Sequence, residues 1–247
     1  MSFWRVLSIV SGLVSLVSFV EAARQAAAGE WPDTLLLGLV LAALAWRFHR
    51  RAARTELAAK VRGPSRVTSD LSADDVHAAL DDDGFWSLVD EARQSARDDE
   101  DALQQLTALC EPLEPVELVA FRLRLDEHLN DAYRWDLWAA AFLIEGGCSD
   151  DGFLYFRAWL VLQGRERFEA ALADPESLAD WIETAVRTDC ESLLYLPIEV
   201  FEKNTGQGFP HDHLPRSPSD PEGEPWDEDD VATVLPKLAA KVGWPGA

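Results

Sequence analysis

Two apolar runs stand out near the start of the pattern of hydrophobic and polar positions. Residues 6–20 contain no charged side chain, and neither do residues 34–46. At a rise of about 1.5 Å per residue each run spans about 20 Å, less than the roughly 30 Å of a hydrocarbon core. Further apolar residues lengthen each run, and tryptophans then lie near the ends of the spans, where membrane interfaces favour them. The pattern predicts a hairpin of two short transmembrane helices near residues 3–23 and 32–49.

The distribution of basic residues predicts the orientation of this hairpin. Seven basic residues follow the second uncharged run before residue 67, whereas Arg24 is the only basic residue in the connection between the spans. Positive charge stays on the cytoplasmic side, so both termini are expected in the cytoplasm and the connection outside. Two alternatives stay open. Residues 1–28 fit a signal peptide that ends in small residues, or both runs are buried helices of a soluble protein.

Beyond the second run the spacing of apolar residues becomes helical. A Gly-Pro-Ser break at 63–65 ends the basic stretch, and residues 69–83 are polar and acidic. Residues 60–82 are therefore expected to link a hairpin segment, residues 1–59, to a globular domain, residues 83–247. In that domain apolar residues recur every three or four positions, and no stretch alternates with period two for long enough to indicate a strand. The predicted fold class is all-α: two transmembrane helices followed by a multi-helix globular domain.

Local start and stop signals place several of these helices. Pro115 suits the first turn of a helix, Gly146 with the glycine after it suits a helix end, and Ser149 before two aspartates suits an N-cap. Pro197 and Pro236 are expected to kink or interrupt the helices that contain them. The apolar repeats predict helices near residues 85–92, 103–109, 115–129, 135–142, 150–160, 165–173, 176–186, 188–203 and 227–241, with a coil-rich arm over residues 206–225.

Charge divides the chain into two unlike parts. The whole chain has 22 basic and 44 acidic residues, a net charge of -22. Residues 1–66 hold nine basic and four acidic residues, a net +5, so the remaining 181 residues hold 13 basic and 40 acidic ones, a net −27. Such acidity repels a polyanion and excludes nucleic acid as the expected partner. The 48% share of hydrophobic residues is enough for a core, which excludes a globally disordered chain.

Cysteine and histidine offer little recognisable chemistry. Cys110, Cys148 and Cys190 are odd in number and widely spaced, so free thiols are expected. Cys148 precedes a predicted helix N-terminus, a position that can lower the pKa of a thiol and make it reactive. His211 and His213 alternate along the arm, but a third ligand at metal-binding spacing is missing. Phosphate-loop, hydrolase and zinc-protease signatures are also missing, so neither a metal nor a cofactor is expected.

Several groups of residues share a pattern with a known family. These groups are Arg-Trp-Asp-Leu-Trp at 134–138, Gly-Gly-Cys-Ser-Asp-Asp-Gly-Phe at 146–153, Tyr-Phe-Arg-Ala-Trp-Leu at 155–160, Phe-Trp at 85–86 with Asp-Glu-Ala-Arg at 90–93, and Gly-Glu-Pro-Trp-Asp-Glu-Asp at 223–229. Over residues 83–243 the chain resembles the bacterial family called domain of unknown function 4240. The resemblance implies an α-helical domain and brings no assigned activity or catalytic residue. The N-terminal hairpin lies outside the pattern.

The same motif supplies the candidate functional residues. Asp136 lies between Trp135 and Trp138, and Asp150 and Asp151 open a predicted helix. Paired acids at a helix start suit a metal site or a general base. Alternatively they cap the helix and complement its dipole. No residue is assigned as catalytic or as a metal ligand from the sequence.

Arg157 and Trp159 complete the candidate motif. Arg157 lies seven residues after Asp150 on one helix face, so an ion pair between them is a possible structural role. Trp159, like Trp135 and Trp138, follows the helical spacing that is typical of core residues. A ligand cage built from these tryptophans is the other interpretation.

These features predict a membrane-tethered cytoplasmic module that binds another protein in a regulatory role and has no catalytic activity. The reason is an acidic helical surface without catalytic signatures, attached to a hairpin that anchors it in the cell membrane. The expected partners are the membrane, through the hairpin, and an unidentified protein. No cofactor and no nucleic acid are expected. The alternative is a hydrolase or metal-dependent enzyme that uses Asp136, Asp150 and Asp151.

Overall fold

The computed structural model describes residues 71–183 and 188–245. The chain divides into two compact units, Met1–Val67 and Thr68–Ala247, and the described residues all belong to the second. The predicted transmembrane hairpin lies outside the described residues and stays a prediction. No helix within the described ranges combines the length and the apolarity that crossing a membrane requires.

The described part of the chain is all-α, as its apolar spacing predicts. The only β-type backbone pairing among the described residues is an isolated parallel bridge between Arg134 and Glu222. The α-helices are α3 (Ala73–Ala79), α4 (Asp82–Ser95), α5 (Asp99–Cys110), α6 (Pro115–Asp131), α7 (Trp135–Glu145), α8 (Asp150–Leu162), α9 (Arg165–Ala173), α10 (Glu191–Thr205), α11 (Val231–Val234) and α12 (Pro236–Val242). Short 3₁₀ helices are η2 (Pro175–Asp180), η3 (His211–His213) and η4 (Glu228–Asp230).

Helix ends in the middle of the domain follow local signals in the sequence. Pro115 occupies the first turn of α6, where backbone N–H groups have no acceptor within the helix, so its missing N–H costs no helical hydrogen bond. Ser149 caps α8, and its hydroxyl accepts a hydrogen bond from the backbone N–H of Gly152 at 3.2 Å. Gly146 ends α7 with a φ of 76°, a left-handed conformation that favours glycine. The predicted start of α6, end of α7 and start of α8 are confirmed.

The last third of the chain departs from the predicted helices in two places. The apolar spacing predicts an α-helix over residues 176–186, whereas a 3₁₀ helix, η2, begins at Pro175 and ends at Asp180. This short element packs against α9 and α12, so tertiary contacts shape it more than its own periodicity does. Residues 227–241 are divided among η4, α11 and α12, because Pro236 lacks an N–H and starts a new helix.

Pro197 behaves differently from Pro236. It lies inside α10, which continues to Thr205 without interruption. Arg122 of α6 donates a hydrogen bond to the carbonyl of Leu194, close to the proline in α10. This contact joins α6 to α10 in the turn before the proline.

The stretch predicted as a linker contains a docked helix. Within residues 60–82, α3 buries Val76, and Leu80 just after it is also buried. Arg124 of α6 donates hydrogen bonds to the backbone carbonyls of His77 and Leu80. The folded domain therefore begins before residue 83, the boundary that composition predicts, because α3, a helix of 7 residues, packs against α6.

The core lies where α4, α6 and α8 meet. Phe85 of α4 packs against Phe121 of α6 with ring centroids 4.8 Å apart. Phe153 and Phe156 of α8 are fully buried beside them. In addition, α10 packs on α6 and α8, and α5 lies along α4. The motif helix α8 is thereby held in a close-packed interior.

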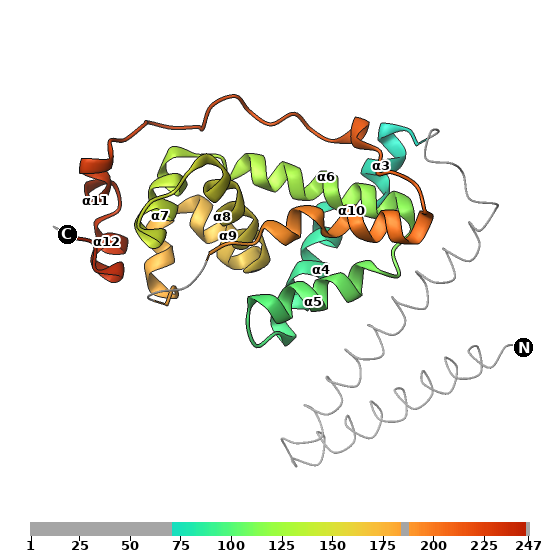
Figure 1. Cartoon of the computed structure of the whole chain (residues 1–247), viewed down its shortest axis with the longest axis horizontal. Helices are drawn as coiled ribbons and strands as arrows, with labels where there is room; N and C mark the ends of the chain where they lie inside the picture. The colour runs from blue at the N-terminus through green and yellow to red at the C-terminus, as the bar shows by residue number, and fades with distance from the viewer. Residues whose placement is uncertain (1–70, 184–187, 246–247) are drawn as a thin grey trace, which may run out of the picture. The chain divides into compact units, whose positions relative to one another are not determined.

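A coil segment after α10, the C-terminal arm (residues 206–227), returns across the domain to α7. Figure 1 shows it running from the end of α10 along the domain to α11. Asn130 at the end of α6 donates a hydrogen bond to the carbonyl of Arg216 at 3.3 Å. Farther along, Glu222 forms the parallel bridge with Arg134. The predicted coil-rich arm is confirmed, and its far end reaches the motif.

Candidate functional site

An arginine–aspartate pair opens α7. Nε and Nη2 of Arg134 donate to the two carboxylate oxygens of Asp136 at 3.2 and 2.6 Å. The backbone N–H of Leu137 donates to Oδ1 of the same carboxylate at 2.8 Å. A two-point contact between a guanidinium and a carboxylate fixes the orientation of both groups. Asp136 is thus engaged in an ion pair with the residue that precedes α7.

Arg134 lies where the start of α7 meets α9 and the C-terminal arm. Its Nη1 donates to the carbonyl of Leu172 in α9 at 2.8 Å. The N–H of Trp135 donates to the carbonyl of Glu222 at 2.9 Å, and the N–H of Glu222 donates to the carbonyl of Tyr133 at 2.9 Å. The start of α7 is therefore held by α9 and by the C-terminal arm.

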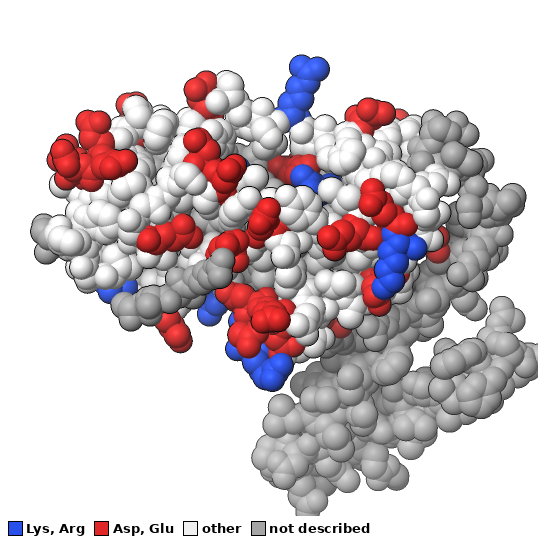
Figure 2. All heavy atoms as spheres, viewed as in Figure 1, with Lys and Arg blue, Asp and Glu red and all other residues white. Residues whose placement is uncertain are grey.

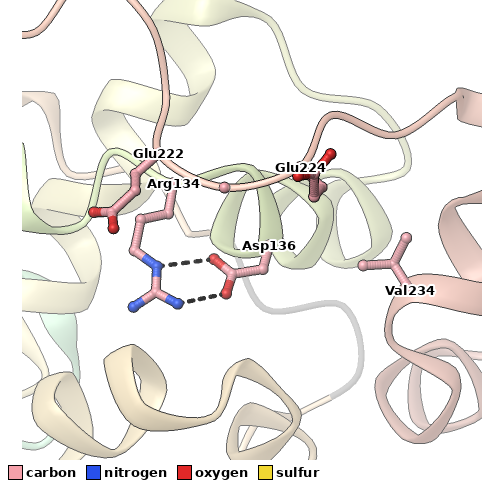
Figure 3. Close-up of a pocket in the computed structure, with 6 residues that line it drawn as sticks. Arg134, Asp136, Glu222, Glu224 and Val234 are labelled. Carbon is pink, nitrogen blue, oxygen red and sulfur yellow. Dashed lines mark hydrogen bonds and ion pairs between the residues drawn. The ribbon is translucent and has the colours of Figure 1, made fainter.

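A pocket of about 240 Å³ lies beside the Arg134–Asp136 pair. Figure 3 shows the two side chains of the pair next to each other and Val234 extending toward the same space from α11. Gly223 has a φ of 97°, which a residue with a Cβ rarely adopts, so glycine allows the arm to turn here. The lining residues come from the start of α7, the arm and α11: Arg134, Asp136, Glu222, Gly223, Glu224 and Val234.

The two tryptophans of the α7 motif are packing residues. Trp138 stacks on Trp135 with ring centroids 5.4 Å apart and on Phe153 at 4.9 Å. Its indole N–H donates to the carbonyl of Cys148 at 3.1 Å, which joins α7 to the turn before α8. Trp226 of the C-terminal arm donates its indole N–H to the carbonyl of Trp135 at 2.7 Å. These contacts fill the space between α7, α8 and the arm.

Asp150 and Asp151 lie in the exposed first turn of α8. Neither lines the pocket that contains Asp136. Negative side chains at this position complement the positive end of the helix dipole. Among the residues that the structure describes, no three His, Cys, Asp or Glu side chains are arranged to hold a metal ion. The structure therefore does not bring the three candidate carboxylates together in one pocket.

Arg157 is buried, with 8% of its surface exposed. Its hydrogen bonds go not to Asp150 but to the backbone carbonyls of Leu129, near the end of α6, and of Phe153. Its guanidinium lies over the rings of Tyr133 and Phe153, 4.6 and 4.9 Å from their centroids. Burial lowers the pKa of Arg157 to about 10. A cation at the C-terminal end of α6 complements the helix dipole, which gives Arg157 a structural role.

Trp159 belongs to the core and anchors a second polar cluster. Its indole N–H donates to Oδ2 of Asp99 at 2.7 Å. Asp99, at the start of α5, also accepts hydrogen bonds from Arg93 at 2.7 Å and Gln163 at 3.2 Å. The Trp159 ring stacks with that of Trp181 at 5.6 Å. The cluster joins α4, α5 and α8, as expected for a core tryptophan.

The three cysteines are free thiols. The helix start does not activate Cys148, because partial burial and the carboxylates of Glu145 and Asp150 raise its pKa to about 12. Burial likewise raises the pKa values of Cys110 and Cys190 to about 12. A thiol with so high a pKa is protonated at neutral pH and is a weak nucleophile.

The pocket includes residues that sequence reasoning does not single out as a site. Of the candidate residues, only Asp136 lines it. Arg134 belongs to the Arg-Trp-Asp motif and Glu224 to the closing segment of the family pattern, so shared membership in that pattern is the signal that connects them. Val234 carries no such signal, because nothing in its spacing indicates that α11 lies beside α7.

The comparisons with known proteins give one match. The model of a family described as a protein of unknown function, DUF4240, matches residues 80–203, half of the chain. Searches among curated proteins and among solved structures found no match. The matched range includes the Arg134–Asp136 pair and ends before the C-terminal arm, so the pocket combines residues from inside and outside this range.

Proposed function

This chain belongs to the DUF4240 family of proteins of unknown function, and we propose that it is a membrane-tethered protein-binding or regulatory module without catalytic activity. In this proposal the helical domain lies in the cytoplasm and recognises another protein, while the segment before residue 68 anchors it. The observation that carries the proposal is that the polar side chains of the motif bind other groups of the same domain, while the surface of the domain is strongly acidic.

The internal contacts of the motif favour a binding role. Asp136 pairs with Arg134, Arg157 binds carbonyls at the end of α6, and Trp138 binds the turn before α8. Acid–base catalysis needs a side chain that is free to exchange a proton with a substrate. A motif that fixes helices against one another provides a preorganised surface instead, which lowers the entropic cost of binding.

The outer surface favours a protein partner with positive charge. On the face shown in Figure 2, acidic side chains lie over most of the domain and outnumber basic ones, with a dense group over the region of α11. Residues 67–247 hold 40 acidic and 13 basic side chains. A field of this sign steers positively charged protein surfaces toward the domain and repels nucleic acid.

The proposed membrane anchor is based on the sequence of the first unit. Two uncharged runs, residues 6–20 and 34–46, are followed by seven basic residues. This order suits a hairpin that keeps the domain on the cytoplasmic side. Tethering raises the effective concentration of the domain near membrane-bound partners, so a modest intrinsic affinity is sufficient.

A hydrolase or metal-dependent enzyme is the second candidate. The position of Asp136 in the pocket lining is the observation that favours it. In that alternative Asp136 acts with Asp150 and Asp151, although the latter two lie outside the lining.

Cross-linking in intact membranes tests the binding proposal. A tagged full chain is cross-linked before solubilisation, and its products are compared with those of residues 1–67 fused to an unrelated soluble domain. A partner that only the full chain captures supports recognition by the helical domain. The same products from both proteins would contradict the proposal, as would metal-dependent turnover of a substrate that a folded Asp136→Asn variant loses.

A further inference from the structure

We propose that the pocket beside Arg134 and Asp136 receives a lysine or arginine side chain from the partner protein. This inference rests on the proposed function, because it names the chemistry of the contact through which the domain recognises its partner. The pocket of about 240 Å³ has a charge-paired floor, an apolar wall and an acidic rim. Each of these parts suits a long side chain that ends in a positive charge.

The floor is the Arg134–Asp136 pair, in which the two charges cancel. Arg134 directs Nε and Nη2 to Asp136 and Nη1 to the carbonyl of Leu172, so each nitrogen of the guanidinium has an acceptor. Three of its five N–H groups are used in this way, and the carboxylates of Asp136, Glu222 and Glu224 around the pocket repel an incoming anion. The Asp136 side chain is 33% exposed, and its Oδ2, which accepts one hydrogen bond from Arg134, can accept another from an incoming donor.

Val234 forms the apolar wall. Val234 is 38% exposed and is one of two large hydrophobic residues exposed in the described ranges. Figure 3 shows it extending from α11 toward the pocket. A lysine or arginine side chain packs its methylene stem against such a surface while its charged head reaches polar groups. A small inorganic cation gains nothing from this wall.

Glu222 and Glu224 give the rim its negative charge. Both are exposed, and within the described part of the chain neither side chain has a hydrogen-bond or ion-pair partner. Figure 3 shows the two carboxylates well apart along the arm rather than converging on one point. A metal ion requires converging ligands, whereas the broad guanidinium and the mobile ammonium bind separated carboxylates. The arrangement therefore favours an organic cation.

The acidic rim continues along the chain. Residues 227–230 are all acidic, so six of the nine residues from 222 to 230 carry a carboxylate. Their combined field raises the local concentration of positively charged segments, and added salt screens it. Exposed ion pairs are individually weak, so the pocket contributes mainly selectivity and association rate, and the rest of the partner's surface supplies affinity.

Methyl NMR on the full chain in detergent micelles locates binding at the pocket. The probe is the peptide acetyl-Gly-Ser-Arg-Ser-Gly-amide, with lysine, norleucine or glutamate in place of arginine for comparison. We expect the arginine and lysine peptides to shift the methyl resonances of Val234 more than those of the other described valines. The norleucine and glutamate peptides should leave the Val234 resonances unchanged.

Two double variants distinguish binding at the pocket from attraction by the acidic surface as a whole. Glu222→Gln with Glu224→Gln neutralises the rim, and Glu166→Gln with Glu202→Gln neutralises two exposed carboxylates on α9 and α10. We expect the rim variant to raise the Kd of the arginine peptide about five-fold and the control variant to raise it less than about two-fold.

Several outcomes would overturn the assignment of the pocket. Two of them are equally weak binding of the arginine peptide by both double variants and methyl shifts that are spread evenly over the described valines. Binding of the norleucine peptide as tightly as the arginine peptide, or no binding of the arginine peptide, would overturn it as well. The cross-linked partner of the full chain is scored separately in the rim variant. If it is captured as well as by the unaltered chain, the pocket is not the contact, while the binding function itself stands.

Discussion

His128 is a side chain at which desolvation and neighbouring charges oppose each other. Its ring packs against Phe85, Trp86 and Phe168, with centroids between 4.6 and 5.5 Å apart. Its Nε2 lies 2.8 Å from Oδ1 of Asp82, whose carboxylate is the first of three that favour the charged form. Desolvation is the larger effect, so the pKa of His128 lies below its ordinary value of 6.5.

This direction of shift predicts a pH-dependent stability. As the pH falls, the unfolded chain protonates His128 first, because burial lowers the pKa of His128 in the folded domain. The contribution of His128 to folding is therefore complete above about pH 6.5 and is lost as the pH falls below that value. We expect His128→Gln to reduce the difference in unfolding free energy between about pH 7.5 and about pH 5.5 in urea denaturation.

The matched control for this prediction is His77→Gln. His77 lies on α3 with an exposed side chain, so its replacement removes an imidazole without removing a buried one. An equal reduction of the pH dependence in the two variants would contradict the argument from burial.

At the scale of single elements, the start of α8 allows two contributions to helix stability to be measured separately: the capping hydrogen bond and the charge of the first turn. The hydroxyl of Ser149 accepts a hydrogen bond from Gly152, whereas Asp150 and Asp151 act on the helix dipole through their charge. We expect Ser149→Ala to lower the unfolding free energy by about 1 kcal/mol, and Asp150→Asn with Asp151→Asn to lower it less. Thermal unfolding measures both. A metal-dependent rise in melting temperature that the double variant lacks would instead support the enzyme alternative.

Elements with local signals could be predicted from the sequence, and those shaped by packing could not. The apolar spacing predicts a helix over residues 165–173, and α9 spans Arg165–Ala173. Likewise Ser149 and Gly146 define helix ends through their own backbone and side-chain chemistry. The 3₁₀ form of η2 depends on α9 and α12, and the docking of α3 depends on α6. Periodicity within one segment contains no information about such neighbours.

The candidate site is harder to predict because its contacts join distant parts of the chain. Asp136 pairs with Arg134, two residues away, and the motif indicates that both matter without indicating the bond. Glu222 reaches Arg134 only because the C-terminal arm returns to α7. Arg157 binds the carbonyl of Leu129 rather than an acid on its own helix, because α6 ends beside α8. Helical spacing predicts a shared face but not the group that covers it.

At the scale of the whole molecule, the division of the chain near residue 67 makes the two units separable. Removal of residues 1–67 removes both uncharged runs and nine of the basic residues, and it removes none of the buried residues of the described core. We expect the full chain to stay with membranes after an alkaline wash. Residues 68–247 alone should be recovered in the supernatant with a helical circular dichroism spectrum and cooperative unfolding.

A fragment that starts at residue 82 is the control for the domain boundary. It lacks α3 and therefore loses the buried side chain of Val76, so it should unfold at lower temperature than residues 68–247. Aggregation of the longer fragment would mean that the first unit completes the core. Release of the full chain by the alkaline wash would contradict the membrane anchor.

The return of the C-terminal arm to α7 also sets the time at which folding can finish during synthesis. Trp226 binds the carbonyl of Trp135, and 91 residues separate them along the chain. At translation rates of about 5–20 residues per second, the start of α7 waits about 5–20 s for this partner. The pocket is therefore completed only after the helices from α7 to α10 have had this time to pack.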